Sequence, residues 1–306
     1  MKLEGLHHIT AITGDAARNV DLYVRVLGLR LVKKSVNQDD PTVYHLFYAD
    51  EDGSAGSDLT FFEYPNARAG RAGAGMVHRI AHRVASVDFW ADRLGSEGVE
   101  TSLVDGALRF ADPEGLEHEL VVVDVPDAPL RARSTEVPAE HALQGFHGVY
   151  AAVVDPRRSA TLLTETMGAS VAGEDSFEVR GDARGSLIHF TAGAGRGFGG
   201  AGTVHHIAWG TKLDEHAAWR ERVAESGRQI TPVIDRFYFR SVYFREPGGI
   251  LYELATAEPG FTVDGPEEEL GRTLILPPFL EHRRAEIEAR LTPLPDPRAD
   301  RGVTAR

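Results

Sequence analysis

A unit of about fifty residues recurs four times along this chain, and the repeat limits its fold more than any other feature. Each copy opens with a short apolar strand, passes an Asp or Ser suited to cap a helix, and ends its helical pattern at a glycine. The openings are Leu6-His7-His8-Ile9, Val77-His78-Arg79-Ile80, Phe146-His147-Gly148-Val149 and Val204-His205-His206-Ile207. The helices are predicted to end near Gly28, Gly98, Gly168 and Gly227, which lie 20, 19, 20 and 21 residues after the third residue of each opening.

The remainder of each copy has strand character. The first helix is predicted from an apolar stripe at Ala16, Val20, Val24 and Leu27. β-rich stretches such as 43–48 follow the helices, and turns such as 246–249 join them. Each copy therefore predicts the order β-α-β-β-β, and the chain as a whole an α+β fold.

The four copies differ where a metal ion would need ligands. At the third residue of the opening strand they carry His8, Arg79, Gly148 and His206. At the equivalent position of the closing strand they carry Thr60, Glu119, His189 and Glu253. Only the first and fourth copies together supply two histidines and a carboxylate, so the sequence predicts one complete metal site, formed by His8, His206 and Glu253.

Two neutral imidazoles and one carboxylate leave coordination positions open, as in non-haem Fe(II) oxygenases. Thr60 favours such a redox-type site, because a second carboxylate there would favour a hydrolytic or isomerising one. A single histidine on an apolar strand is more often a core residue, but the repeat of the position favours ligands. Glu253 in an apolar strand supports this, since a buried unpaired carboxylate is costly without a cation. Mn(II) is the alternative to Fe(II).

The repeated unit, the HHI openings and the PGG-x3-E hairpin resemble the vicinal oxygen chelate superfamily, which includes glyoxalases, bleomycin-resistance proteins and dioxygenases. A narrower resemblance is to hydroquinone-type ring-cleaving dioxygenases, and it extends from Leu3 to about Leu294. It is carried by Leu6 to Thr10, Thr13 to Ala16, Tyr44 to Leu46, Tyr48 to Asp50, Gly145 to His147 and Arg236 to Glu253. The resemblance implies four βαβββ modules paired into two half-barrel-like domains, with iron bound by His8, His206 and Glu253 between the first and fourth modules.

The resemblance also implies that Tyr243, Arg236 and His7 are catalytic. Tyr243 is suited to hydrogen-bond a bound phenolate, although it also fits an ordinary strand aromatic residue. Arg236 is suited to stabilise developing negative charge, the alternative being a surface pair with Asp235. His7 is suited to orient a bound group, but adjacent strand residues face opposite ways, so this role needs a local twist.

Repeat and composition together suggest the domain organisation. We expect a first domain over 1–124, a linker over 125–144, a second domain over 145–260 and a C-terminal extension over 261–306. Within the extension, the turn at 276–280 is a candidate for closing the substrate cavity.

The composition narrows the classes of function. The net charge is −13 without a basic run, which argues against nucleic acid, and no apolar stretch has membrane length. The chain has no cysteine, which excludes thiolate ligands and disulfides. We expect a cytoplasmic enzyme with a small aromatic substrate and molecular oxygen as partners, and a homo-oligomer is left open.

Three functions are compatible with these residues. The leading one is an Fe(II)-dependent ring-cleaving, extradiol-type dioxygenase acting on hydroquinone-like or related phenolic aromatics. The second is a metal-dependent glyoxalase-type isomerase or lyase, which would want a fourth protein ligand in place of Thr60. The third is a non-enzymatic small-molecule-binding resistance protein, for which an intact metal site would serve no purpose. The fold alone does not separate them.

Overall fold

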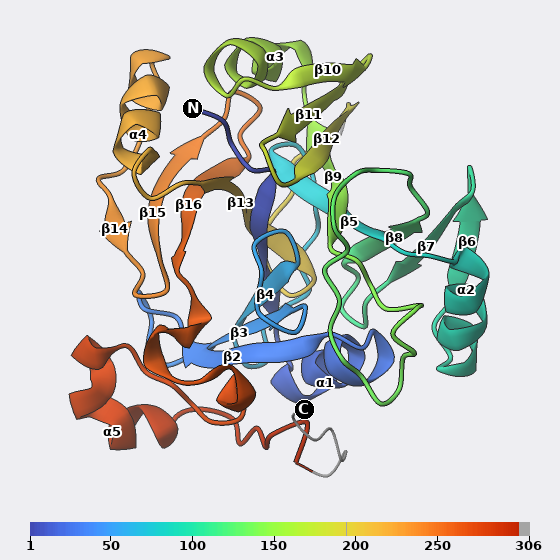
Figure 1. Cartoon of the computed structure of the whole chain (residues 1–306), viewed down its shortest axis with the longest axis vertical. Coiled ribbons are helices and arrows are strands. Elements are labelled where there is room, and N and C mark those ends of the chain that lie inside the picture. Colours follow the sequence, from blue (N-terminus) through green and yellow to red (C-terminus); the bar gives the residue numbers. More distant parts are fainter. Residues whose placement is uncertain (194, 300–306) are drawn as a thin grey trace.

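The computed structural model describes residues 1–193 and 195–299, whose strands form two eight-stranded mixed sheets (Figure 1). The first sheet has the order β14-β15-β16-β13-β1-β4-β3-β2, and the second has the order β10-β11-β12-β9-β5-β8-β7-β6. Along the chain, four βαβββ units follow one another. The predicted fold class is therefore confirmed.

The elements of the four units have the following bounds. The first contains β1 (Leu6–Thr13), α1 (Ala16–Val20), the π-helical turn η1 (Asp21–Val26), β2 (Arg30–Val36), β3 (Tyr44–Ala49) and β4 (Asp58–Glu63). The second contains β5 (Met76–Arg83), α2 (Val87–Ser96), β6 (Thr101–Val104), β7 (Ala107–Ala111) and β8 (Glu117–Val121). The third contains β9 (Phe146–Val153), α3 (Arg157–Thr161), the π-helical turn η2 (Leu162–Thr166), β10 (Ser170–Gly173), β11 (Ser176–Arg180) and β12 (Gly185–Ala192). The fourth contains β13 (Thr203–Thr211), α4 (His216–Glu225), β14 (Ile234–Asp235), β15 (Phe239–Arg245) and β16 (Leu251–Pro259).

The glycines that were predicted to end the helices do so. Gly28, Gly98, Gly168 and Gly227 all have positive φ, at 72°, 73°, 74° and 81°. A helix often ends on a residue in this left-handed conformation, which glycine adopts without a steric penalty. The constant spacing of the repeat thus has a conformational cause.

The sheets do not follow the order of the units. Units one and four share the first sheet through β1 and β13, whereas units two and three share the second through β5 and β9. Each sheet therefore takes one unit from either side of the linker at 125–144. The division into domains over 1–124 and 145–260 stays a prediction. Each sheet contains strands from both of these ranges.

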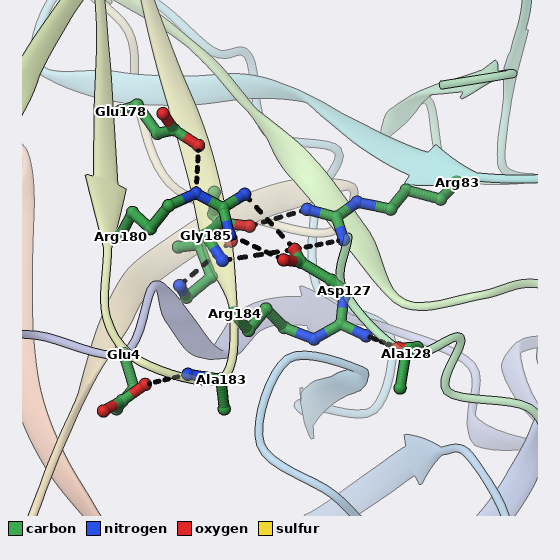
Figure 2. Close-up of polar contacts among 11 residues, drawn as sticks. Glu4, Arg83, Asp127, Ala128, Glu178, Arg180, Ala183, Arg184 and Gly185 are labelled. Atoms are coloured by element: carbon green, nitrogen blue, oxygen red, sulfur yellow. Dashed lines mark hydrogen bonds and ion pairs between the residues drawn. The ribbon is translucent and has the colours of Figure 1, made fainter. Parts of the chain in front are cut away.

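The linker is held against the second sheet by buried ion pairs (Figure 2). The Asp127 carboxylate accepts hydrogen bonds of 2.6 Å from both Arg83 at the end of β5 and Arg180 on β11. Arg184 donates to the Ala128 carbonyl oxygen at 2.6 Å. Figure 2 shows Asp127 between Arg83 and Arg180, so one linker carboxylate joins two units.

The C-terminal extension packs along β2 and contains the 3-10 turns η3 (Phe261–Asp264), η4 (Glu267–Glu269) and η5 (Pro278–Arg283), and α5 (Arg284–Glu288) (Figure 1). The buried Lys33 ammonium bonds Asp264 Oδ1 at 2.6 Å. The turn at 276–280 does not line the cavity described below, and Phe279 is 54% exposed. The expectation that this turn closes the cavity is therefore wrong. No described helix has the length and apolar character needed to span a membrane.

Replacing Asp127 by Asn is expected to lower the free energy of unfolding by about 3 kcal/mol, because it leaves Arg83 without its buried counter-charge. Urea unfolding followed by circular dichroism measures this. Asp155→Asn, which removes an exposed pair with Arg157, serves as the control and should change little. Equal effects of the two substitutions would contradict the role given to Asp127.

The same contribution should depend on pH. Burial raises the pKa of Asp127, but hydrogen bonds from Arg180 and Arg83 outweigh it and hold the pKa at about 2. A lowered carboxyl pKa stabilises the fold above the unfolded-state pKa of about 4. The difference between wild type and Asp127→Asn should therefore be full above pH ~4 and shrink as the pH falls toward 2.

Candidate metal centre

The strand register brings the three predicted ligands together. β1 runs antiparallel to β13, and β13 runs parallel to β16, which places the three side chains on one face of the first sheet. His8, His206 and Glu253 are 2%, 5% and 0% exposed. Within the described residues, they are the group of histidines and carboxylates arranged to hold a metal ion. The prediction of one complete site formed by units one and four agrees with this geometry.

The facing atoms are spaced as ligands of one ion would be. Glu253 Oε2 lies 2.9 Å from His206 Nε2 and 3.2 Å from His8 Nε2, and the two Nε2 atoms are 3.4 Å apart. Adjacent ligands of an octahedral ion with bonds near 2.1 Å are about 3 Å apart. The three atoms therefore fit one face of an octahedron.

One of the two carboxylate oxygens of Glu253, Oε1, already accepts a hydrogen bond. Ser241 donates a 2.5 Å hydrogen bond to Oε1, whereas the buried Oε2 has no hydrogen-bond partner in the described structure. Burial raises the pKa of Glu253, but the His8 and His206 imidazoles outweigh this and hold it well below its usual range. An ionised, buried oxygen with no donor is the oxygen that a cation would satisfy. The residues present therefore fit a divalent metal ion.

Each ligand histidine is preceded in the chain by a second histidine that contacts its outer side. His8 Nδ1 lies 3.0 Å from His7 Nδ1, and His206 Nδ1 lies 2.8 Å from His205 Nδ1. If Nε2 of a ligand is to offer its lone pair to a metal, the proton must be on Nδ1, which then donates to the neighbouring ring. His7 and His205 are thus placed to fix the tautomer of His8 and His206.

β-bulges make these adjacent contacts possible. His7 and His8 together oppose Ala208 on β13, and His205 is an extra residue between the partners of Thr10 and Ala11. A bulge redirects a side chain that would otherwise face away. The twist that a role for His7 required is therefore present, but His7 does not line the cavity and contacts His8 instead.

The same bulge position carries histidine in all four units. Register shifts place His78 and His147 as the extra residues of β5 and β9. Sequence reasoning missed His205 as a site residue because it compared the following position, where the units differ. The signal that would have found it is the histidine common to all four openings.

A cavity of about 370 Å³ opens onto the three ligands. This volume suits a small ligand. Its walls are rich in aromatic rings, supplied by Phe47, Phe62, Tyr64, Tyr238 and Phe239. Polar groups enter it from His45, His205, Arg236 and Tyr243. A small cavity with aromatic walls and several polar groups is suited to a single aromatic ring.

Two of the predicted catalytic residues face this cavity. Tyr243 is the cross-strand partner of Glu253, and its ring lies 5.8 Å from that of His206. Burial, followed by the charge of Glu253, raises the pKa of Tyr243 above its usual range, so its hydroxyl keeps its proton at neutral pH. The Arg236 guanidinium lies over the Tyr243 ring, 5.6 Å from its centre. Tyr243 therefore lies at the wall of the cavity, beside the candidate ligand His206.

Arg236 is held by a partner that the sequence did not indicate. Its Nη1 and Nη2 donate to Asp39 at 3.1 and 2.9 Å, and Gln38 donates to its carbonyl oxygen at 2.8 Å. The surface pair with Asp235 is therefore wrong, because the Asp235 carboxylate accepts from the Phe237 backbone instead. The fork geometry of the Asp39 pair orients the guanidinium at the cavity.

The second sheet lacks an equivalent centre for two physical reasons. A Cβ atom on Gly148, the residue that corresponds to His8 in unit three, would lie 2.4 Å from the Leu187 carbonyl oxygen, so no side chain fits there. In unit two, the buried Glu119 carboxylate accepts from Arg109 at 2.7 Å and from Tyr150 at 2.6 Å. Arginine supplies there the positive charge that a metal would supply in the first sheet.

The register confirms the alignment of the closing strands. Thr60, Glu119 and Glu253 occupy the same position in their units. Each pairs with the residue two positions after the third residue of the opening strand, which is Thr10, Ala81 or Ala208. The Thr60 hydroxyl is bonded to Thr10 at 2.8 Å and to His45 at 2.9 Å. The fourth equivalent position thus carries a neutral hydroxyl that is occupied by neighbouring residues.

Residues 5–120 match the family model described as the Glyoxalase/Bleomycin resistance protein/Dioxygenase superfamily. The chain is 37% identical to a Bacillus subtilis protein named "Putative ring-cleaving dioxygenase MhqA", over 96% of this chain and 100% of that protein. The chain belongs to this superfamily. It is also 33% identical to the chlorohydroquinone/hydroquinone 1,2-dioxygenase of Sphingobium indicum, over 94% of this chain and 95% of that one.

Solved structures support the same assignment. A crystal structure titled as a putative dioxygenase from Bacillus subtilis superposes with a TM-score of 0.91 at 39% identity, covering 96% of this chain and 98% of that one. Glyoxalase I from Zea mays superposes with a TM-score of 0.58 at 17% identity, over 83% of this chain and 92% of that one. The second likeness shows the fold alone.

Glu253→Gln is expected to abolish tight metal binding while leaving the fold intact, since a neutral amide no longer balances a divalent ion. Metal content after loading with Fe(II) or Mn(II), measured by plasma mass spectrometry, should fall from about one ion per chain to a small fraction. Added metal should raise the melting temperature of the wild type and not that of the variant.

Glu119→Gln provides the matched control, because Glu119 occupies the equivalent position of the second sheet. It should keep the full metal content. Metal retained by Glu253→Gln, or lost equally from both variants with native circular dichroism spectra, would contradict the assignment of the centre.

Proposed function

We propose that this protein is an Fe(II)-dependent ring-cleaving, extradiol-type dioxygenase acting on hydroquinone-like or related phenolic aromatics. The observation that carries the proposal is the convergence of His8, His206 and Glu253 at one end of an aromatic-walled cavity. The relatives named above as ring-cleaving dioxygenases support it. Molecular oxygen is the second substrate, and Mn(II) is the alternative metal.

The ligand set suits a phenolic substrate on grounds of charge. Two neutral imidazoles and one carboxylate leave a divalent ion with one net positive charge, which a phenolate neutralises. When bound, such an ion supplies redox contact between an electron-rich ring and oxygen. The three protein ligands hold one face, so the remaining positions stay open to small molecules.

Side chains around the cavity supply the proton and charge chemistry. The Tyr243 hydroxyl, which is protonated at neutral pH, can donate a hydrogen bond to a phenolate oxygen. The Arg236 guanidinium, fixed by Asp39, stabilises negative charge that develops on the reacting groups. His7 keeps His8 in the tautomer that a metal needs, and is a positioning residue.

The state of Thr60 supports an oxygenase over an isomerase or lyase of the same fold. Its hydroxyl is engaged by Thr10 and His45, and a fourth protein ligand is missing at that position. The proposal includes a cytoplasmic location and leaves a homo-oligomer open. It includes neither a nucleic-acid nor a membrane partner, in line with the acidic net charge of −13.

Protein loaded anaerobically with Fe(II) should consume oxygen when a substituted hydroquinone is added, and less or none with a catechol. An oxygen electrode measures the uptake, and absorbance spectra follow loss of the aromatic ring. His206→Ala should abolish uptake. Absence of uptake with either phenol, despite stoichiometric iron, would overturn the proposed reaction.

Tyr243→Phe should lower kcat by about 10²-fold while metal content stays unchanged, because the lost hydroxyl takes part in proton transfer and not in metal binding. Steady-state oxygen uptake and metal analysis measure the two effects. Phe244→Leu, a buried change one residue along β15, is the control for general damage to the strand. A Tyr243→Phe variant with wild-type kcat would remove Tyr243 from the mechanism.

A further inference from the structure

We propose that His45 accepts a hydrogen bond from the second hydroxyl of a 1,4-dihydroxybenzene, and that it selects hydroquinones over phenols that lack this group. The inference rests on the proposed function, because it takes the first ring oxygen to be bound at the His8, His206 and Glu253 centre. Three properties of the His45 imidazole support the inference: its orientation, its protonation and its free acceptor atom.

The neighbours of His45 on the sheet fix its orientation. β3 runs antiparallel to β4, where Phe47 is opposite Thr60 and His45 is opposite Phe62. Its ring packs against those of Phe47 and Phe62, with centres 3.9 and 4.4 Å away. These contacts hold the imidazole at the wall of the cavity, among its lining residues.

The hydrogen-bond chain behind His45 assigns its tautomer. The Thr60 hydroxyl donates to Thr10 Oγ1 at 2.8 Å, which uses the single proton that Thr60 has. In this arrangement the imidazole donates the 2.9 Å contact between its Nε2 and Thr60 Oγ1, and this is the tautomer on which the proposal rests. With its proton on Nε2, the neutral ring carries a lone pair on Nδ1.

That lone pair is free and reachable. In the described structure, Nδ1 of His45 has no hydrogen-bond partner, and the part-buried residue lies among those that line the cavity. Burial is the largest cause that lowers the pKa of His45 well below its usual range, so the ring stays neutral. Two other acceptors of the lining are already engaged, because Asn37 Oδ1 accepts from the Asp39 backbone and the Asp39 carboxylate holds Arg236.

The substrate class follows from where phenol oxygens lie on a ring. A catechol has adjacent oxygens, and both can bind one metal ion. A hydroquinone bound through one oxygen points its other hydroxyl across the cavity, where that donor needs an acceptor. His45 offers a neutral acceptor without a counter-charge, which suits a hydroxyl that keeps its proton.

The test compares hydroquinone with 4-fluorophenol, which has a similar size but no second donor. Dissociation constants are measured by calorimetry on Fe(II)-loaded protein under argon, for wild type, His45→Phe and His45→Asn. The wild type should favour hydroquinone by about tenfold, the value of one good hydrogen bond. His45→Phe should remove this preference without weakening the binding of 4-fluorophenol, and His45→Asn, with an acceptor at the δ position, should restore part of it.

His189→Phe is the matched control. Its imidazole is also bonded to a hydroxyl, that of Ser176 at 2.7 Å, and stacks on an aromatic ring, that of Tyr150, but it lies in the second sheet. It should keep the wild-type preference. An undiminished preference in folded His45→Phe overturns the role of His45.

Oxygen uptake separates this inference from the proposed function. A preference that survives in His45→Phe, with normal wild-type uptake, refutes the role of His45 alone. A preference lost in His45→Phe, without uptake by the wild type, supports the binding role and refutes the proposed reaction. Failure of the wild type to bind either phenol refutes both.

Discussion

The antiparallel pairing of β1 with β13 is the contact on which the site depends. It joins units that lie at opposite ends of the repeat and sets His8 beside His206. β16 then continues the same sheet from β13 and adds Glu253. Because a buried carboxylate is costly without a compensating charge, a cation bound at this site would in turn stabilise the strand pairing.

The two sheets balance the charge of a buried carboxylate in two different ways. In the first sheet, Glu253 faces two imidazoles and has an oxygen without a donor. In the second sheet, Glu119 is satisfied by Arg109 and Tyr150. An arginine is a permanent cation that fills its space, whereas imidazoles leave room for an exchangeable ion. The repeat thus separates a half whose carboxylate is satisfied by protein groups from a half that could hold a metal ion.

The features that could be predicted from the sequence are those set by the spacing of residues within one unit. The βαβββ order, the helix-ending glycines and the three ligands all follow from aligning four copies. The sequence did not indicate contacts between units. An example is the pair of Asp39 and Arg236, which are 197 residues apart in sequence. The bulges that turn His7 and His205 toward the ligands were not visible either, because a bulge is a relation between two strands. The turn at 276–280 was assigned to the cavity from composition alone, and packing along β2 placed it elsewhere.

Gly148 shows how firmly this asymmetry is built in. A side chain there would collide with the Leu187 carbonyl oxygen, which belongs to the backbone of the adjacent strand. Returning a histidine to unit three would therefore require β9 and β12 to separate, and their hydrogen-bonded ladder opposes that. Placing a ligand there would thus need a change in the pairing of two strands as well as a change of residue. The difference between the two sheets therefore lies partly in the main chain.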